Sequence, residues 1–118
     1  MSKTILVVDD SMVSRMMIKE IIKGHQPSAK VIEASSGDNA LEQLTHESKI
    51  DIALIDYNMP GMTGLELFNE LKGMINIPKR VLLTANIQDD IKTRTLEAGI
   101  VFLNKPISED VVAPFINS

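Results

Sequence analysis

The sequence predicts an α/β fold with a mostly parallel, five-stranded sheet and helices on both faces. Five short apolar segments alternate along the 118 residues with segments of helical periodicity. Most of the apolar segments are continuous runs of Ile, Val and Leu, which are typical of parallel strands covered on both faces. Right-handed crossovers between such strands place helices on both sides of the sheet.

The predicted strands are all short, and only the second mixes charged with apolar residues. They cover residues 5–8, 30–33, 52–55, 81–83 and 100–103. Parallel strands need long crossover connections, and the segments between these runs are long enough to hold one helix each.

The first predicted helix has a plausible N-cap in Ser11 and a plausible stop at Gly24. Its apolar residues recur at helical spacing and form one stripe, which we interpret as core-facing. The stripe and its edge contain Met12, Val13, Met16, Met17, Ile21 and Ile22. Core filling is the favoured role for the methionines, and a groove for a partner is the alternative.

The other four helices have recognisable starts or ends. Ser36 precedes the second helix, and Thr63 with Glu66 forms a capping box for the third. The fourth helix runs from residue 88 to 98 and ends before a glycine. The fifth begins after Ser108, and Pro114 inside it predicts an irregular helix, because proline lacks a backbone donor.

Composition limits the classes of function. The formal net charge is −4 without a basic stripe, so binding to nucleic-acid phosphates has no visible footprint. Cysteine is absent, which rules out disulfides and thiolate metal sites. No apolar run has the length of a membrane span, and the N-terminus lacks a signal peptide. We therefore expect a single cytoplasmic domain over residues 1–118 without membrane or nucleic-acid contacts.

Polar side chains follow four of the five predicted strands. They are Asp9 and Asp10 after the first strand, Asp56 after the third, Thr84 after the fourth and Lys105 after the fifth. Because ligands bind beyond the carboxyl ends of parallel strands, we expect these side chains to meet at one edge. Three carboxylates suit Mg²⁺, while Lys and Thr suit phosphoryl oxygens. The set predicts a phosphoryl-transfer site in which one carboxylate attacks.

Each of these residues also has a simpler interpretation. Asp9 and Asp10 could form a turn or cap a helix, and Asp56 could serve the turn that follows it. Thr84 could be an ordinary strand residue, and Lys105 a solvated surface residue. Five such residues at the same end of their strands favour a functional cluster.

Four motifs resemble those of bacterial response-regulator receiver domains, the CheY-like family. They are VVDDS, LIDYNMPGMTG, LLTA and FLNKP, and they occur in the family's order along the whole chain. The resemblance implies a flavodoxin-like (βα)5 fold with strand order 2-1-3-4-5. It also implies a phosphorylation-dependent switch of a two-component system, which is phosphorylated by a histidine kinase or a phosphotransfer protein.

The resemblance assigns a role to each matching position. Asp56 corresponds to the phosphoacceptor, and Asp9, Asp10 and the backbone carbonyl of Asn58 correspond to ligands of Mg²⁺, with Asp56 completing the set. Lys105 corresponds to the lysine that pairs with Asp56 and then with the phosphoryl group, and its bond to Pro106 is often cis in the family. We also predict that the three crowded carboxylates give at least one raised pKa.

The switch is expected to involve two further positions. Thr84 corresponds to the hydroxyl that bonds the phosphoryl group, and Phe102 to an aromatic ring that rotates with it. Phe102 could equally be a core aromatic. An output face is expected on the last two helices and the fifth strand, with core packing as the alternative for its candidates, which are Val111, Val112, Phe115 and Ile116.

Three alternatives remain at this point. The chain could be the receiver part of a larger regulator with a DNA-binding or enzymatic output domain. An aspartyl-phosphate phosphatase of the haloacid dehalogenase kind is less favoured, because Asn58 stands where that group needs a second acid. A scaffold independent of phosphorylation conflicts with the intact set of site residues. We expect a monomer or weak dimer that is not a conventional enzyme and acts on an output protein not identified by the sequence.

Overall fold

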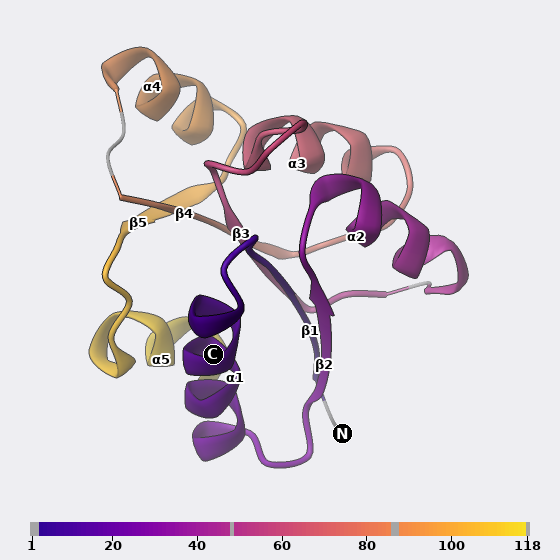
Figure 1. Ribbon diagram of the computed structural model, residues 1–118, viewed down its shortest axis with the longest axis vertical. Coiled ribbons are helices and arrows are strands. Elements are labelled where there is room, and N and C mark those ends of the chain that lie inside the picture. The colour runs from indigo at the N-terminus through magenta and orange to yellow at the C-terminus, as the bar shows by residue number, and fades with distance from the viewer. Residues whose placement is uncertain (1–2, 48, 86–87, 118) are drawn as a thin grey trace.

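The computed structural model describes residues 3–47, 49–85 and 88–117. Its sheet contains five parallel strands in the order β2-β1-β3-β4-β5 (Figure 1). The strands are β1 (Thr4–Val8), β2 (Lys30–Ala34), β3 (Ile52–Asp56), β4 (Lys79–Thr84) and β5 (Val101–Asn104). The predicted fold class, strand direction and strand order are confirmed, and the strand limits differ by one or two residues.

Five helices cover the two faces of the sheet (Figure 1). They are α1 (Met12–His25), α2 (Gly37–Gln43), α3 (Gly64–Lys72), α4 (Asp89–Glu97) and α5 (Glu109–Asn117). Helices α1 and α5 lie together on one face, whereas α2, α3 and α4 lie on the other. Among the described residues, no helix is both long and apolar enough to cross a bilayer.

The strands bury their side chains on both faces, as their continuous apolar sequences predict. In β1, Leu6 and Val8 pack in the core beneath α2 and α3, whereas Ile5 and Val7 pack beneath α1 and α5. All four are fully buried. Burying one such side chain contributes about 1.5–3 kcal/mol, so β1 anchors both layers and holds its carboxyl end in place.

The predicted caps form hydrogen bonds in the structure. The Ser11 hydroxyl accepts from the backbone N–H of Ser14 at 3.3 Å, so Ser11, and not Asp10, caps α1. The Thr63 hydroxyl accepts from the N–H of Glu66, whose carboxylate accepts from the N–H of Thr63. This capping box is confirmed, and it fixes the first turn of α3 next to the end of β3.

Two predictions about helices are wrong. Helix α1 passes through Gly24 and ends at His25, where the N–H of Gln26 donates to the carbonyl of Ile22 at 2.7 Å. A glycine inside a helix costs only about 0.5–1 kcal/mol, which the packing of α1 outweighs. Helix α5 was expected to be irregular, but it forms one nine-residue α-helix that includes Pro114.

The interpretation of the methionines as core residues is also wrong. Met12, Met16 and Met17 are 64%, 59% and 47% exposed, and Val13 beside them is 64% exposed. The residues that α1 buries against the sheet are Ile18 and Ile22. The apolar positions of α1 therefore extend around the helix. One part packs on the sheet, and the first two turns present an apolar patch to solvent, here called the methionine patch (Met12, Val13, Met16 and Met17).

Candidate metal centre at the carboxyl edge of the sheet

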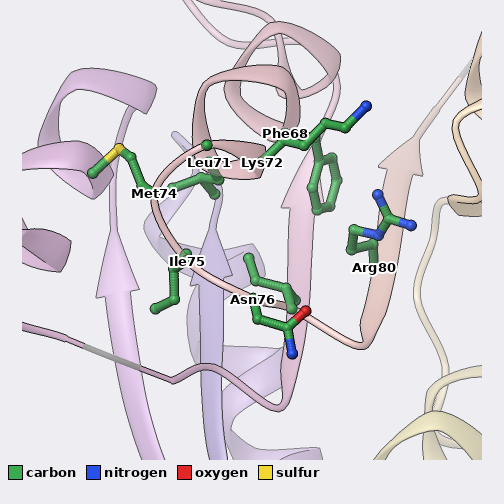
Figure 2. Close-up of a pocket in the computed structure, with 9 residues that line it drawn as sticks. Phe68, Leu71, Lys72, Met74, Ile75, Asn76 and Arg80 are labelled. Carbon is green, nitrogen blue, oxygen red and sulfur yellow. The ribbon is translucent and has the colours of Figure 1, made fainter.

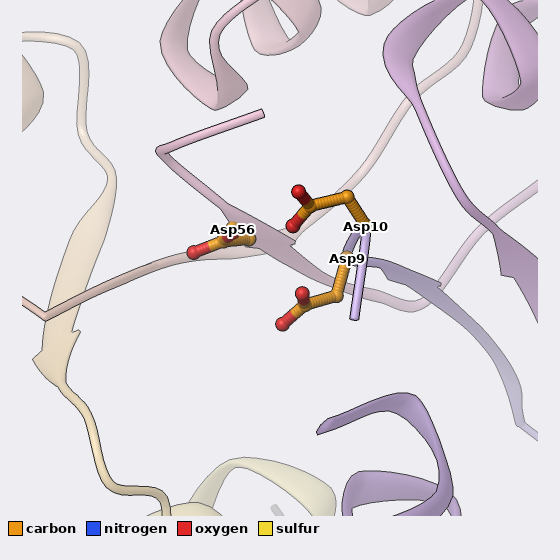
Figure 3. Close-up of side chains that lie close together, drawn as sticks. All are labelled: Asp9, Asp10 and Asp56. Carbon is orange, nitrogen blue, oxygen red and sulfur yellow. The ribbon is translucent and has the colours of Figure 1, made fainter. Parts of the chain in front are cut away.

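The register between β1 and β3 brings the predicted carboxylates together. Val8 pairs with Ile55, so Asp9 and Asp56 follow on adjacent central strands. Carboxylate oxygens of Asp9, Asp10 and Asp56 lie within 4.8 Å of one another (Figure 3). Asp9 and Asp56 are buried, whereas Asp10 is exposed. The three side chains therefore form a pocket that opens to solvent on the side of Asp10.

Asp9 is fully buried and each of its carboxylate oxygens accepts a hydrogen bond. Its Oδ1 accepts from the N–H of Ser11 at 2.9 Å, and its Oδ2 accepts from Nζ of Lys105 at 2.8 Å. The first bond is the turn role that the simpler interpretation gave to Asp9. The second ties Asp9 to the site, so this residue has both roles.

Lys105 is the cation of the pocket, and it contacts two carboxylates. Its Nζ is 2.8 Å from Asp9 Oδ2 and 3.3 Å from Asp56 Oδ1. Burial alone would lower the pKa of Lys105, but the hydrogen bond to Asp9 and the charges of Asp56 and Asp9 outweigh burial and raise that pKa. Lys105 therefore stays charged at neutral pH. The expected cis bond to Pro106 is present.

Asp56 holds its proton more tightly than an ordinary aspartate. The pKa of Asp56 is raised from 3.8 to about 6, chiefly by burial and then by the charges of Asp9 and Asp10, while Lys105 opposes the rise. The predicted raised pKa is confirmed, with the difference that burial contributes more than repulsion between carboxylates. With a pKa of about 6, most Asp56 side chains are ionised at neutral pH.

The other predicted site residues lie near this edge in different environments. Thr84 is fully buried at the carboxyl end of β4, where its carbonyl accepts from the N–H of Lys105 at 2.8 Å. Asn58 is exposed in the loop after β3. Phe102 is half-buried in β5 and packs against the core, and Nζ of Lys92 lies 5.3 Å from its ring centroid. Phe102 thus belongs to the core and also borders α4.

The donor set fits a small divalent cation. Three carboxylates with hard oxygens lie within reach of one ion, and one of them is open to solvent. Lys105 balances only one of their negative charges. Mg²⁺ commonly takes one or two carboxylates and keeps waters or phosphate oxygens, so the residues present match this ion.

The comparison with protein families decides which kind of protein carries this pocket. The model of the response regulator receiver domain matches residues 5–116. The chain belongs to the response regulator receiver domains. A receiver domain is a signalling domain, and the family resemblance seen in the four motifs is confirmed.

Curated relatives of this receiver domain include whole response regulators and larger enzymes. The two-component response regulator ORR5 of Oryza sativa is 36% identical over an alignment of 113 residues, which covers 92% of this chain and 82% of ORR5. The cyclic di-GMP phosphodiesterase response regulator RpfG of Xanthomonas campestris is 36% identical over an alignment of 107 residues, which covers 87% of this chain and 28% of RpfG. The chain therefore spans little more than a quarter of RpfG.

Solved receiver domains have the same fold. A response regulator receiver domain from Clostridium thermocellum superposes with a TM-score of 0.83 at 25% identity and covers 98% of this chain and 91% of that one. A CheY-like receiver domain from Methanospirillum hungatei gives 0.81 at 23% identity over 98% and 91% of the two chains. The second likeness supports the fold alone.

The receiver domain also contains a site-positioning residue that the sequence motifs do not indicate. Nη1 of Arg15 donates to the backbone carbonyl of Asp9 at 2.6 Å, and its Nε lies 3.7 Å from Oε1 of Glu33. The sequence offers one indication of this role, a single arginine in the first turns of α1, shortly after the strand that ends before Asp9. Spacing alone did not show that it turns back to β1.

Gly64 is a second residue that sequence reasoning missed. A Cβ added at Gly64 would lie 2.4 Å from the carbonyl oxygen of Asp56 and 2.9 Å from Leu82 Cδ1. The N–H of Gly64 donates to the carbonyl of Tyr57 at 3.0 Å. Only glycine allows α3 to begin this close to the residue that ends β3.

Proposed function

We propose that this receiver domain is phosphorylated on Asp56. The observation that carries the proposal is a buried Asp56 carboxylate, flanked by Asp9 and Asp10, with the Lys105 ammonium 3.3 Å away. Asp56 is ionised above about pH 6, which leaves its oxygen free to act as a nucleophile. The proposed donor is the phosphohistidine of a sensor histidine kinase or phosphotransfer protein.

The proposed step exchanges one bond to phosphorus for another. An oxygen of Asp56 attacks phosphorus in line, the bond from phosphorus to the histidine nitrogen breaks, and that nitrogen keeps the electron pair and takes up a proton. The Lys105 ammonium, which contacts the Asp56 carboxylate, is proposed to pair with the phosphoryl oxygens after the transfer. Bound Mg²⁺ would add positive charge for these oxygens, held by Asp9, Asp10, Asp56 and the backbone carbonyl of Asn58.

The switch is proposed to follow from new acceptor oxygens at Asp56. Thr84 lies at the carboxyl end of the neighbouring strand, and its hydroxyl is the proposed hydrogen-bond donor to the phosphoryl group. Phe102 borders α4 and is the proposed ring that responds. Of the four residues expected on the output face, Val112 and Ile116 are buried and Phe115 is half-buried, which leaves only Val111 exposed. Core packing was the alternative for these candidates and it holds for Val112 and Ile116, so the proposed output surface on α5 is Val111 with part of Phe115.

The methionine patch is the proposed contact for the phosphodonor protein. It covers the first two turns of α1, which begins directly after Asp9 and Asp10. Four large apolar side chains at this position are exposed next to the pocket that must meet a phosphohistidine. Methionine suits such a surface, because its flexible thioether side chain adapts to different partners.

The extent of the domain, its location in the cell and its lack of enzymatic activity are further proposals. We propose that residues 1–118 form one receiver domain, located in the cytoplasm, which is not a conventional enzyme. The alternative of a larger regulator is supported by RpfG, of which this chain matches 28%. The phosphatase alternative is still disfavoured, since Asn58 stands at the position, two residues after Asp56, where that group needs its second acid.

Acetyl phosphate tests the phosphoacceptor. Incubation with Mg²⁺ should add the mass of one phosphoryl group to the wild type and to Asp38→Asn, whose exposed side chain lies on α2. Asp56→Asn should gain nothing, because it lacks the nucleophile. Phosphorylation of Asp56→Asn to the wild-type extent, or none in the wild type with acetyl phosphate and beryllofluoride both inert, contradicts the assignment.

A further inference from the structure

We propose that the groove between α3 and α4 binds a small ligand with a phosphate or carboxylate group and an apolar body. This α3–α4 groove has a volume of about 530 Å³, within the range of small-molecule sites. Its cations come from three different elements, namely Lys72 of α3, Arg80 of β4 and Arg94 of α4. Its apolar wall includes Phe68 and Ile100.

The proposal rests chiefly on Arg80, because its guanidinium has few hydrogen-bond partners in the structure. Among the described residues, the buried Nε atom has no hydrogen-bond partner, and Nη2 donates a long hydrogen bond, 3.5 Å, to the Gly99 carbonyl. None of the ion pairs among the described residues involves Arg80. A half-buried cation without a carboxylate partner is costly, and an anion in the groove would offset that cost.

The other charges of the groove leave room for an anion. Lys72 and Arg94 also take part in none of the ion pairs seen in the described part of the chain. Of the acids in the groove, Glu66 is already used, since its carboxylate accepts from the N–H of Thr63. That hydrogen bond, with a smaller contribution from the charge of Arg94, lowers the pKa of Glu66. With Glu70 as the second acid, the groove contains three cations and two carboxylates. One of these carboxylates, that of Glu66, already takes part in the helix cap.

A second hollow adjoins the groove and indicates where the apolar body would lie. It has a volume of about 380 Å³ and shares Phe68, Lys72 and Arg80 with the α3–α4 groove. Figure 2 shows the Arg80 guanidinium beside the Phe68 ring, with Leu71 and Ile75 on the other side of the hollow. A ligand with its anionic group at Arg80 can therefore rest a flat apolar part against Phe68.

This site is separate from the phosphorylation pocket. Arg80 lies at the beginning of β4 and Thr84 at its end, so four residues of extended strand, about 13 Å, separate them. Anion binding here requires neither Asp56 nor a metal. The proposal stands even if the phosphoacceptor assignment fails.

Titration of the ¹⁵N-labelled chain followed by NMR tests the site. The probes are phenyl phosphate, benzoate and inorganic phosphate, added at constant ionic strength with EDTA to keep metals from the carboxylates. We expect saturable shifts at the amides of residues 65–80 and 94–100 with at least one aromatic probe. Tighter binding of phenyl phosphate indicates a phosphate ligand, and tighter binding of benzoate a carboxylate. Absence of saturable shifts with both overturns the proposal.

Variants separate the groove from general attraction of anions. Arg80→Gln should weaken aromatic-probe binding by about tenfold or more, and Arg80→Lys by less, because it keeps the charge but loses the fork. The double variant Lys72→Gln and Arg94→Gln changes exposed side chains only and tests the site if Arg80→Gln does not fold. Lys19→Gln, on the opposite face, is the control. Equal binding by the control, Arg80→Gln and the double variant overturns the proposal.

Discussion

Lys105 Nζ lies closer to Asp9 than to Asp56, at 2.8 Å against 3.3 Å. The family resemblance assigned this lysine to Asp56, and the structure shows that it bridges both. Asp9 is fully buried on a central strand, whereas Lys105 follows the edge strand β5. The ammonium is thus held from one side by Asp9, which leaves its contact with Asp56 as the one that can change when Asp56 is modified.

Removing the ammonium should raise the pKa of Asp56 further. In Lys105→Met the carboxylates lose the group that, in the described part of the chain, lowers the pKa of Asp56, so we expect a value above about 6 in a carboxyl NMR titration without metal. Mg²⁺ should bind more tightly than to the wild type, because it no longer competes with Lys105. Lys92→Met is the control, and an unchanged pKa in Lys105→Met would show that Lys105 does not act on Asp56.

The contribution of Asp56 to stability without metal should fall as the pH rises from about 4 to about 6. The folded chain holds the Asp56 proton with a pKa of about 6 against 3.8 for an ordinary aspartate, so the folded state binds more protons in this interval. Asp56→Asn should therefore gain on the order of 2 kcal/mol over the wild type at pH 8 and nothing at pH 3.5. Urea unfolding in EDTA measures both. A pH-independent difference would contradict the raised pKa.

Two glycine-to-alanine changes should act in opposite directions. Gly64→Ala should lose about 2–4 kcal/mol, because its Cβ would meet the Asp56 carbonyl at 2.4 Å and force β3 and α3 apart. Gly24→Ala should gain about 0.5 kcal/mol, since nothing lies within 4 Å and alanine is the better helix former. Urea unfolding gives the free energies, and loss of phosphorylation in folded Gly64→Ala would show that Asp56 has moved.

Replacing Arg15 should lower the unfolding free energy more than replacing Lys19, which lies one turn further along α1. Arg15→Met removes a charged donor from the Asp9 carbonyl and should cost about 1.5–3 kcal/mol of unfolding free energy, with weaker Mg²⁺ binding. Lys19→Met breaks only an exposed ion pair with Glu33 and should cost less than about 1 kcal/mol. Equal losses in the two variants would mean that the bond from Arg15 does not position Asp9.

A charge in the methionine patch should change the rate of phosphorylation by a protein phosphodonor but not by acetyl phosphate. Met16→Lys should change the unfolding free energy by less than about 0.5 kcal/mol, because Met16 is 59% exposed. It should slow transfer from a phosphorylated histidine protein without slowing acetyl phosphate. Met74→Lys, half exposed after α3, is the control. Equal rates from the protein donor for both variants would remove the patch from the proposed contact.

The sequence predicts those features that depend on the local pattern. Continuous apolar runs predict the parallel strands because both faces of β1 and β3 are covered. The strand ends predict the site because register places Asp9 next to Asp56 without any contribution from the helices. The capping box of α3 is predicted because its two bonds join residues three apart in sequence.

Features that depend on tertiary contacts could not be predicted in the same way. The periodicity of α1 does not show which side of a helix with several apolar faces packs on the sheet, so Met16 was placed in the core instead of Ile18. The bond from Arg15 to Asp9 depends on how α1 leaves β1. The close approach at Gly64 depends on the distance between α3 and β3, which no spacing in the sequence encodes.

The exposure of α1 has a consequence for oxidative chemistry. Met12, Met16 and Met17 offer their thioethers to solvent, whereas Met59 is buried at 8% exposure. Mild peroxide would therefore convert the α1 methionines, together with the half-exposed Met74, to polar sulfoxides before Met59 and leave the core packing intact. The folded domain would survive with a chemically altered α1 surface, and a methionine sulfoxide reductase could restore it.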